Sequence, residues 1–553
     1  MIVGGLAAGP SAAAKARREN EGMEIIVFEQ SGDISYGTCG LPYFFSNVIK
    51  KEEDLLVSDP AQFSKRFQID LRTFTRVTRI DAKAKKVFWE NLKTKASGEQ
   101  SYDKLVFATG AKPIWSKMPG MDAKNIFPMR TLDDLKQMSQ YLESQKPKSA
   151  AVIGGGLIGL EMAENLAMRG LKVTVIEKAP QILTPMDSEF ALQAQKLFEK
   201  ENVKVITGFG LTEIKTANGI AVGVKLENGQ EIESQLVVMS VGIVANSDLL
   251  KAEGVKTNER GIILVNEKME TNLPDVYAAG DCALVPGHQV TGDTAWLPLG
   301  SIANKMGRTA GQNAAGGRGF FKTAAGTMIV KIFENTFAKT GLNEREAKQK
   351  KLNYGAIVVH VGDHASYYPG AKSLAIKLIY QKNDGLLLGA QVSGEQGVDK
   401  RIDVLATALF NKMKVTDLME LDLAYAPPYS SAKDPVIVAG MAASNAVEFQ
   451  CDPYLPDSLK ARLDSKVPYQ LIDVRTIGER SRGYIEGSVH IPIDELRDRQ
   501  NELARDKEII LYCHKGLRGY VSARFLRNRG FNNVKNLSGG FTSWEMYGLP
   551  VKK

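Results

Sequence analysis

Cysteine is scarce in this chain, which has only four among its 553 residues, at positions 39, 282, 451 and 513. So few and so widely spaced cysteines argue against a disulfide framework and favour a reducing compartment. No apolar run is long enough to span a bilayer, and no signal peptide precedes the first motif. We therefore expect a cytoplasmic protein.

A strong charge of either sign is also missing. The chain has 71 Lys and Arg against 63 Asp and Glu, an excess of 71 − 63 = +8 that is spread along the sequence. Such a spread excess is typical of a soluble surface and disfavours nucleic-acid binding, although it could help to hold an anionic, phosphate-bearing substrate. The length predicts about three or four domains, and 51 glycines with 44% hydrophobic residues are typical of a soluble α/β protein.

The first residues form a pattern that predicts a dinucleotide site. A short strand leads into the turn 4–9, a helix follows, and the next strand ends at Glu29. Glycines admit a pyrophosphate, the helix N-terminus stabilises its charge, and the acid binds ribose hydroxyls. Leu6 replaces the middle glycine of the usual pattern. The predicted contacts are Gly4, Ala8, Gly9 and Glu29.

A second turn of the same kind is more regular. Strand 151–153 leads into Gly-Gly-Gly-Leu-Ile-Gly at 154–159 and a helix, and strand 172–176 ends at Glu177. This strand–turn–helix–strand context predicts a second nucleotide site. Glu177 would repel a 2′-phosphate and favours NADH, whereas Lys178 leaves NADPH open. The predicted contacts are Gly154, Gly156, Gly159 and Glu177.

Two further segments connect these nucleotide sites. Residues 107–113 form a crossover between them, and residues 271–281 return a strand that ends in Asp281. With these segments the chain resembles the two-dinucleotide-binding flavoprotein disulfide reductase superfamily. The resemblance implies that the first nucleotide is FAD, with Asp281 on its ribitol chain, a helix starting at 296–300 beneath the flavin ring, and a structural Cys282. It adds Thr109 and Gly110 to the FAD contacts.

One cysteine lies in a glycine-flanked turn, Ser-Tyr-Gly-Thr-Cys-Gly-Leu-Pro-Tyr at 35–43. Taken alone, Cys39 could be a redox thiol or a small buried hydrophobe. The motif resembles the single-cysteine branch of the superfamily, which includes NADH peroxidase, NADH oxidase and coenzyme A disulfide reductase, and this implies a redox role. Ala7 stands where the peroxidase and oxidase have a histidine, which favours thiol–disulfide or persulfide chemistry.

Two tyrosine-bearing segments, 364–370 and 423–430, lie in the strand-and-helix region after Gly326. An isolated tyrosine is usually a packing residue. Both segments nevertheless resemble coenzyme A disulfide reductases, in which a tyrosine from each reaches the partner subunit's active cysteine. The resemblance implies a homodimer with a shared active site, and catalytic roles for Tyr425 and for Tyr367 or its neighbour Tyr368. A phenol can protonate a leaving thiolate.

Coenzyme A needs cations for its phosphates. The first helix places Ser11, Lys15 and Arg18 on one face, at positions i, i+4 and i+7. Ordinary solvated helix charges explain these residues equally well. The resemblance assigns CoA binding to Ser11, Lys15, Arg18, Ser35, Asn304 and Lys433.

The last hundred residues form a new α/β unit. Strand 471–475 is followed by strand 508–512, which runs into Cys-His-Lys-Gly-Leu-Arg at 513–518 and a helix. A strand-to-helix turn aims backbone N–H groups at Cys513 and lowers its pKa. Every segment resembles a single rhodanese domain, which implies a persulfide on Cys513 and added positive potential from Arg518. His514 and Lys515 either tune substrate charge or are solvated loop residues.

The predicted fold is α/β with two Rossmann-like domains for FAD and NAD(P)H, an α+β dimerisation domain and a rhodanese-like domain. The predicted boundaries are 1–118 with 247–320 for FAD, 119–246 for NAD(P)H, 321–443 for dimerisation, 444–462 for a linker and 463–553 for rhodanese. We expect an NAD(P)H-dependent reductase of CoA persulfide, polysulfide or CoA disulfide that releases sulfide. The alternatives are an NADH peroxidase or oxidase and a redox-sensing sulfur-carrier scaffold. Neither a metal, a nucleic-acid partner nor membrane association is predicted.

Overall fold

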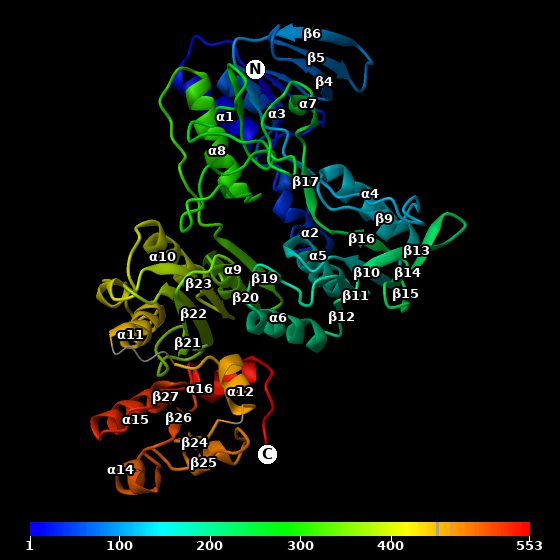
Figure 1. The fold of residues 1–553 in the computed structure, drawn as a ribbon. Helices are drawn as coiled ribbons and strands as arrows, with labels where there is room; N and C mark the ends of the chain where they lie inside the picture. Colours follow the sequence, from blue (N-terminus) through cyan, green and yellow to red (C-terminus); the bar gives the residue numbers. More distant parts are fainter. Residues whose placement is uncertain (449–452, 466) are drawn as a thin grey trace. The chain divides into compact units, whose positions relative to one another are not determined.

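The computed structural model describes residues 1–448, 453–465 and 467–553, which form two compact units (Figure 1). The first unit contains residues 1–180 and 198–326, and the second contains residues 181–197 and 327–553. In the part of the chain that the structure describes, no helix is both long and apolar enough to cross a membrane. The predicted linker 444–462 includes the end of one helix and most of another, while Cys451 lies outside the described residues.

The first unit begins with a parallel sheet in the order β18-β7-β1-β2-β3. Ile2 of the central strand pairs with Val27 on one side and with Val106 on the other. Strands β1, β2, β7 and β18 are apolar and buried, as expected for a parallel sheet that is covered on both faces. The bounds are β1 Ile2–Val3, β2 Ile26–Phe28, β3 Asp70–Arg72, β7 Leu105–Phe107 and β18 Val276–Ala278.

Helices α1 (Ala8–Glu19) and α8 (Gly300–Ala314) lie side by side in this unit (Figure 1). Their close approach depends on small residues. A Cβ at Gly307 would lie 2.2 Å from the Ala8 carbonyl oxygen, and one at Gly311 would lie 2.1 Å from that of Ala12. This contact fixes the helix that starts at the first glycine turn.

The second sheet of the first unit is also parallel, in the order β12-β11-β10-β16-β9. Its central strand starts a second strand–turn–helix unit that leads into α5 (Leu157–Met168). The bounds are β9 Ile126–Phe127, β10 Ser149–Ile153, β11 Lys172–Glu177, β12 Lys204–Thr207 and β16 Val237–Met239. Smaller sheets are formed by β4 Thr75–Asp81, β5 Lys86–Asn91 and β6 Ser97–Ser101; by β13 Leu211–Ala217, β14 Ile220–Leu226 and β15 Glu231–Glu233; and by β8 Ala111–Pro113 with β17 Ile243–Ala245.

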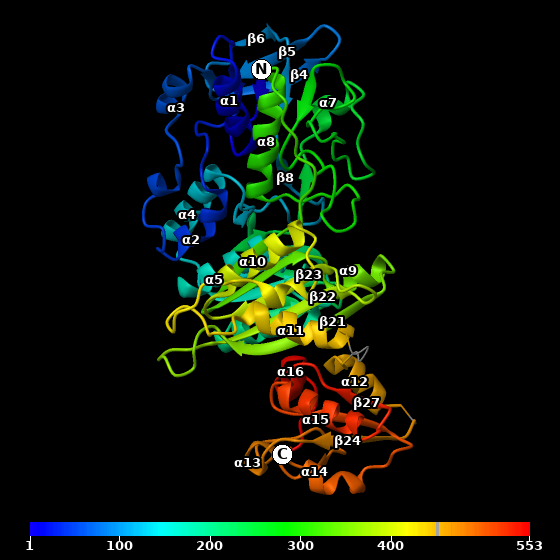
Figure 2. The same cartoon turned by 90° about the vertical axis from the view of Figure 1, so that its left-hand side faces the viewer.

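The second unit contains an antiparallel sheet in the order β19-β20-β23-β22-β21, with helices α10 and α11 against it (Figure 2). The bounds are β19 Met328–Ile332, β20 Asn335–Gly341, β21 Tyr354–Gly362, β22 Ser373–Gln381, β23 Leu387–Gly394, α10 Val398–Phe410 and α11 Pro435–Glu448. A four-stranded parallel sheet follows, in the order β25-β24-β26-β27. Its elements are α12 Pro456–Leu463, β24 Tyr469–Asp473, α13 Ile477–Arg480, β25 Val489–His490, α14 Leu496–Arg499, β26 Glu508–Tyr512, α15 Leu517–Asn528, β27 Val534–Asn536 and α16 Gly540–Met546.

The remaining helices connect these sheets, and their bounds are α2 Leu41–Phe45, α3 Pro60–Phe67, α4 Leu132–Gln145, α6 Ser188–Lys200, α7 Asp248–Lys251 and α9 Glu344–Gln349. Short 3-10 helices are η1 Thr38–Gly40, η2 Glu52–Leu55, η3 Asp417–Glu420 and η4 Gln500–Glu502.

A buried ion cluster lies inside the second unit. The ammonium of Lys377, on β22, is 1% exposed and lies 2.9 Å from Asp187, 2.5 Å from Glu189 and 2.6 Å from Glu344. The Tyr547 hydroxyl, beyond α16, donates a hydrogen bond to Glu189 over 2.9 Å. Residues from α6, α9, the antiparallel sheet and the segment after α16 therefore meet at one buried charge.

Candidate active sites

The two glycine turns of the first unit have the same geometry. Gly4 has a φ of 110° and Gly154 a φ of 109°. The Gly5 N–H donates to the Glu29 carboxylate over 2.6 Å, and the Gly155 N–H donates to Glu177 over the same distance. Each turn therefore lies beside the acid that ends the neighbouring strand, as the sequence predicts.

The chemistry of these turns fits two dinucleotides. Neither α1 nor α5 has an acidic residue in its first turn or a side chain that caps its first N–H groups. Free N–H groups at a helix N-terminus bind anions. A Cβ at Gly9 would lie 1.8 Å from the Gly4 carbonyl oxygen, and one at Gly159 would lie 1.9 Å from that of Gly154. Only glycine permits these tight turns.

Asp281 follows strand β18 at the carboxyl end of the first sheet. Burial raises the pKa of its carboxyl group, and the Arg130 guanidinium, 3.1 Å away, opposes that shift. Trp296 donates its indole N–H to the Asp281 carbonyl over 2.9 Å. Thr109 uses its hydroxyl to donate to the Asn246 carbonyl, while Gly110 has a positive φ of 67°. Sequence reasoning missed Arg130, which is 151 positions from Asp281 and has no local signal.

Cys39 lies on η1 and is exposed, whereas Cys282 is buried and hydrogen-bonds through its sulfur to backbone carbonyls. Burial raises the pKa of Cys282 to about 11, so this thiol stays protonated at neutral pH. Exposure removes the packing alternative for Cys39. Its redox role stays a prediction.

Tyr43 and Glu161 form a contact near Cys39 that sequence reasoning missed. The Tyr43 hydroxyl lies 3.4 Å from the Glu161 carboxylate and donates to it. Burial raises the pKa of Glu161 to about 7. Tyr43 completes the cysteine motif, and Glu161 comes two residues after Gly159. The sequence signal that could have found these two residues is their closeness to the cysteine motif and to the second glycine turn.

The predicted CoA residues are only partly brought together. Ser11 donates to the side-chain oxygen of Asn304 over 2.6 Å, and Lys15 forms an ion pair with Glu19. Arg18 is exposed on the same helix. The backbone N–H of Ser35 donates to the Gly5 carbonyl, which ties its segment to the first glycine turn. Lys433 belongs to the second unit and is exposed there.

In the second unit the hydroxyls of Tyr367 and Tyr425 lie 2.7 Å apart. Both side chains are accessible, with exposed fractions of 73% and 48%. The pKa of Tyr367 is raised by its hydrogen bond to Tyr425. Two segments separated by 58 positions thus present one hydrogen-bonded phenol pair.

Buried Arg401, on α10, joins the segments that carry this phenol pair. Its Nη2 donates to the Asp363 carbonyl over 2.6 Å and to the Asp434 carboxylate over 3.0 Å. Ser430 donates to the same carboxylate, and its own carbonyl accepts from the N–H of Ala365. Sequence reasoning missed this arginine because no local motif marks it.

Cys513 lies in a backbone cradle between β26 and α15. Its side chain is 1% exposed, and its sulfur accepts the Gly516 N–H over 3.1 Å. Gly516 has a φ of 100°, which favours glycine at this turn. Burial lowers the pKa of neighbouring His514, so its imidazole is neutral at pH 7. Arg518 interacts electrostatically with the Cys513 side chain and donates twice to Glu479, over 2.8 and 2.6 Å.

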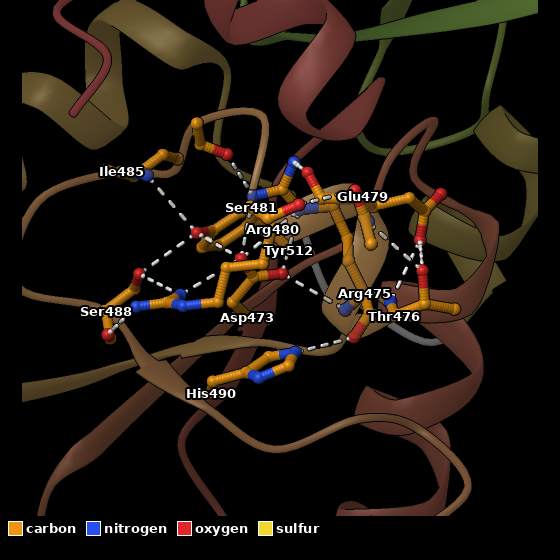
Figure 3. Close-up of polar contacts among 12 residues, drawn as sticks. Asp473, Arg475, Thr476, Glu479, Arg480, Ser481, Ile485, Ser488, His490 and Tyr512 are labelled. Carbon is orange, nitrogen blue, oxygen red and sulfur yellow. Dashed lines mark hydrogen bonds and ion pairs between the residues drawn. The ribbon is translucent and has the colours of Figure 1, made fainter. Parts of the chain in front are cut away.

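Figure 3 shows a buried polar network around Asp473 and Tyr512, at the ends of two neighbouring strands. Asp473, fully buried at the end of β24, accepts hydrogen bonds from Arg475, Arg480 and Tyr512. The Tyr512 hydroxyl also lies 3.0 Å from that of Ser488. Because Tyr512 directly precedes Cys513, this network fixes the end of the strand that carries the cysteine.

The matched families define the class of protein. Residues 1–307 match the pyridine nucleotide-disulphide oxidoreductase family, residues 327–435 match its dimerisation domain, and residues 455–547 match the rhodanese-like domain. The chain therefore belongs to the pyridine nucleotide-disulphide oxidoreductase family and is an oxidoreductase. Membership implies FAD and NAD(P)H as cofactors.

Individual relatives cover most or all of the chain. It is 35% identical to an NADH oxidase of Methanocaldococcus jannaschii, over 79% of this chain and 97% of the relative. It is 33% identical to coenzyme A disulfide reductase of Staphylococcus haemolyticus, over 80% of this chain and 98% of the relative.

Two solved structures extend the likeness through the rhodanese-like domain. Reduced Bacillus anthracis CoADR-RHD is 40% identical with a TM-score of 0.95, covering 99% of this chain and 97% of that one. An NAD-dependent persulfide reductase from A. fulgidus is 37% identical with a TM-score of 0.90, covering 98% and 99%. The predicted family and fold class are confirmed, whereas the domain boundaries and site residues stay predictions.

Proposed function

We propose that this chain reduces CoA persulfide, polysulfide or CoA disulfide with NAD(P)H, through a single redox cysteine, Cys39. The observation that carries the proposal is the contrast among the described cysteines. Cys39 is exposed, Cys282 is buried, and Cys513 is enclosed in its own cradle in the other unit. A lone exposed thiol is suited to pair with an external thiol. The relatives named coenzyme A disulfide reductase and persulfide reductase support this choice of substrate.

The first unit would hold both cofactors. Gly4, Ala8, Gly9, Glu29, Thr109, Gly110 and Asp281 would bind FAD, and Gly154, Gly156, Gly159 and Glu177 would bind the nicotinamide nucleotide. FAD, when bound, takes the hydride of NAD(P)H and supplies two electrons to the thiol centre. NADH is the preferred donor in this proposal, because Glu177 repels a 2′-phosphate and Lys178 is paired with Glu227 at 2.9 Å.

Cys39 would first act as a nucleophile. Its thiolate attacks the inner sulfur of CoA–S–SH, which forms Cys39–S–S–CoA and releases HS⁻. Two electrons and one proton then convert this mixed disulfide into the Cys39 thiolate and CoA–SH. The sum is CoA–S–SH + NADH → CoA–SH + HS⁻ + NAD⁺, which balances in atoms and charge.

The proton and the CoA site involve both subunits of the proposed homodimer. Tyr425 and Tyr367 of one subunit would protonate the CoA thiolate that leaves Cys39 of the other. Ser11, Lys15, Arg18, Ser35, Asn304 and Lys433 would bind CoA. The match to a dimerisation domain supports this assembly, and we place the enzyme in the cytoplasm.

The rhodanese-like domain would handle sulfane sulfur. Cys513 takes sulfur from a persulfide or polysulfide, with the cradle N–H groups stabilising the resulting Cys513–S–SH. CoA, on its long flexible arm, would carry sulfur between Cys513 and Cys39. Sulfide and thiol are the products.

Two cysteine variants test this division of labour. Cys39→Ser should abolish NADH oxidation with CoA persulfide while sulfurtransfer remains, and Cys513→Ser should do the reverse. Wild-type turnover with CoA persulfide or polysulfide should exceed turnover with hydrogen peroxide or oxygen. Faster turnover with oxygen would instead favour an NADH oxidase, the name of the Methanocaldococcus relative, and faster turnover with peroxide would favour an NADH peroxidase. Ala7 counts against both. Absence of both activities from the wild-type protein would indicate a redox-sensing sulfur-carrier scaffold.

A further inference from the structure

Glu479, on α13, neutralises the arginine beside Cys513. Arg518 donates its Nη1 and Nη2 to the two carboxylate oxygens of Glu479, in a bidentate pair. Glu479 is itself fixed, because it accepts from the N–H and hydroxyl of Thr476 in a capping box. The Arg518 hydrogen bond lowers the pKa of Glu479 to about 2, so the carboxylate is charged at neutral pH. The pair therefore has no net charge.

Arg475, Arg480 and His514 do not replace Arg518 as a cation at this loop. Arg475 is 1% exposed and pairs with Asp473 behind Tyr512, and Arg480 pairs with the same carboxylate. His514 is neutral at pH 7, since burial lowers its pKa. Lys515 is an exposed cation of the loop. The positive electrostatic potential at the Cys513 loop is thus weaker than the loop sequence alone suggests.

Exposed apolar residues flank Glu479 and Arg518 in the sequence, and we call Ile477, Leu517 and Val521 the apolar rim. Ile477 comes two residues before Glu479 and is 73% exposed, and Leu517 comes directly before Arg518 and is 71% exposed. The ion pair holds these two helix starts together. Val521 follows Leu517 by one helical turn and is 41% exposed. These exposed apolar side chains are available to contact the carbon chain of a substrate that reaches the ion pair.

We propose that Glu479 makes the Cys513 site selective for organic persulfides over thiosulfate. The carbon chain of the persulfide would contact Leu517 and Ile477. This rests on the proposed function in assigning sulfane-sulfur transfer to Cys513. Glu479 is a specificity-determining residue in this role, because it acts on the substrate's charge through Arg518 and takes no part in bond making.

The charge of the two reactions explains the selection. With an organic persulfide, Cys513–S⁻ + R–S–SH → Cys513–S–SH + R–S⁻, and the reacting atoms carry one negative charge. With thiosulfate, Cys513–S⁻ + S–SO₃²⁻ → Cys513–S–S⁻ + SO₃²⁻, and they carry three. Concentrating three negative charges in a partly dehydrated cradle requires cations that are not already paired. Arg518 is already paired with Glu479, and exposed Lys515 can offset only one of the three charges.

The test compares donors on the full-length enzyme with FAD bound and no NADH, using cyanide as the acceptor. The probes are thiosulfate and the persulfide of N-acetylcysteamine, and the rate of Cys513→Ser is subtracted as background. Glu479→Gln keeps the capping box, since Gln also serves at this position. We expect kcat/KM for thiosulfate to rise about tenfold in this variant, while that for the persulfide stays within about twofold. Glu486→Gln, which removes an exposed carboxylate paired with Lys552, is the matched control and should change neither value.

A second variant tests the apolar rim independently. Leu517→Ser should lower kcat/KM for the persulfide about fivefold and leave thiosulfate within about twofold. An unchanged donor ratio in Glu479→Gln, or an equal loss with both donors, would overturn the proposal. Because no NADH is present, such a failure says nothing against Cys39 chemistry. If the wild-type enzyme transferred sulfur no faster than Cys513→Ser with either donor, the proposed function of this domain would be overturned.

Discussion

The hydroxyl of Tyr367 lies 2.7 Å from the hydroxyl of Tyr425, and both side chains are accessible. Hydrogen-bonded phenols of this kind can deliver a proton to a leaving thiolate and recover it from one another. We expect Tyr425→Phe to lower kcat with CoA disulfide about tenfold or more, and the double variant with Tyr367→Phe about a hundredfold.

Flavin reduction by NADH, followed by rapid-mixing absorbance, should stay unchanged in these variants, because the phenols act only on the CoA thiolate. Tyr429→Phe is the control, since Tyr429 lies in the same segment and is 72% exposed. A fall in flavin reduction equal to the fall in kcat would contradict the assignment.

Glu161 is expected to give the reductive half-reaction its pH dependence. It lies on the helix that starts at the predicted NADH turn and contacts Tyr43, four residues after Cys39. Burial raises its pKa to about 7, so the carboxyl group is neutral below that pH and charged above it. A carboxylate stabilises the positive charge that develops on nicotinamide as hydride leaves. The rate of flavin reduction should therefore rise with pH through about 7.

Glu161→Gln removes that titration. We expect a flat profile between about pH 6 and 8 and a rate about tenfold lower at the alkaline end. Exposed Glu143→Gln on α4 is the matched control and should keep the wild-type step. A step that survives in Glu161→Gln would assign the titration to another group.

Short-range sequence motifs predicted the elements that form the candidate sites. These motifs are the glycine turns, the acids at the ends of their strands, and the loop at Cys513, and each has a known physical role in binding or catalysis. The structure brings Gly5 to Glu29 and Gly155 to Glu177 because each pattern encodes its own strand–turn–helix geometry.

Residues that modify those motifs could not be predicted in this way. Arg130 meets Asp281 across 151 positions, and Glu161 meets Tyr43 across 118. Glu479 meets Arg518 across 39, which changes Arg518 from a source of positive potential into half of a neutral pair. Such contacts depend on how whole elements pack, and no spacing in one stretch of sequence encodes them.

The contact between α1 and α8 should control FAD retention. A methyl group at Gly307 would lie 2.2 Å from the Ala8 carbonyl oxygen, so Gly307→Ala must push the helices apart. Ala8 belongs to the turn that we expect to hold the FAD pyrophosphate. We predict a loss of about 1–3 kcal/mol in stability and a lower flavin-to-protein absorbance ratio after purification.

Lys305→Ala on the exposed side of α8 is the control for this helix, and it should keep both flavin content and melting temperature. Full flavin retention in Gly307→Ala would show that the helix pair moves without disturbing the turn.

The Lys377 cluster should set the stability of the second unit. Burial by itself would lower the pKa of Lys377, but the carboxylates of Asp187, Glu189 and Glu344, with Tyr547, raise it well above its ordinary value. Replacing the ammonium in Lys377→Met leaves several buried carboxylates without a cation, and breaking a buried pair in this way costs about 3–5 kcal/mol. Tyr547→Phe removes only the hydrogen bond to Glu189, which costs about 1–3 kcal/mol.

Differential scanning calorimetry should show the larger fall in melting temperature for Lys377→Met. The control is Tyr368→Phe, whose side chain is 43% exposed and whose melting temperature should match the wild type. Equal melting temperatures for Lys377→Met and wild type would mean that the carboxylates are neutralised by protons and need no cation.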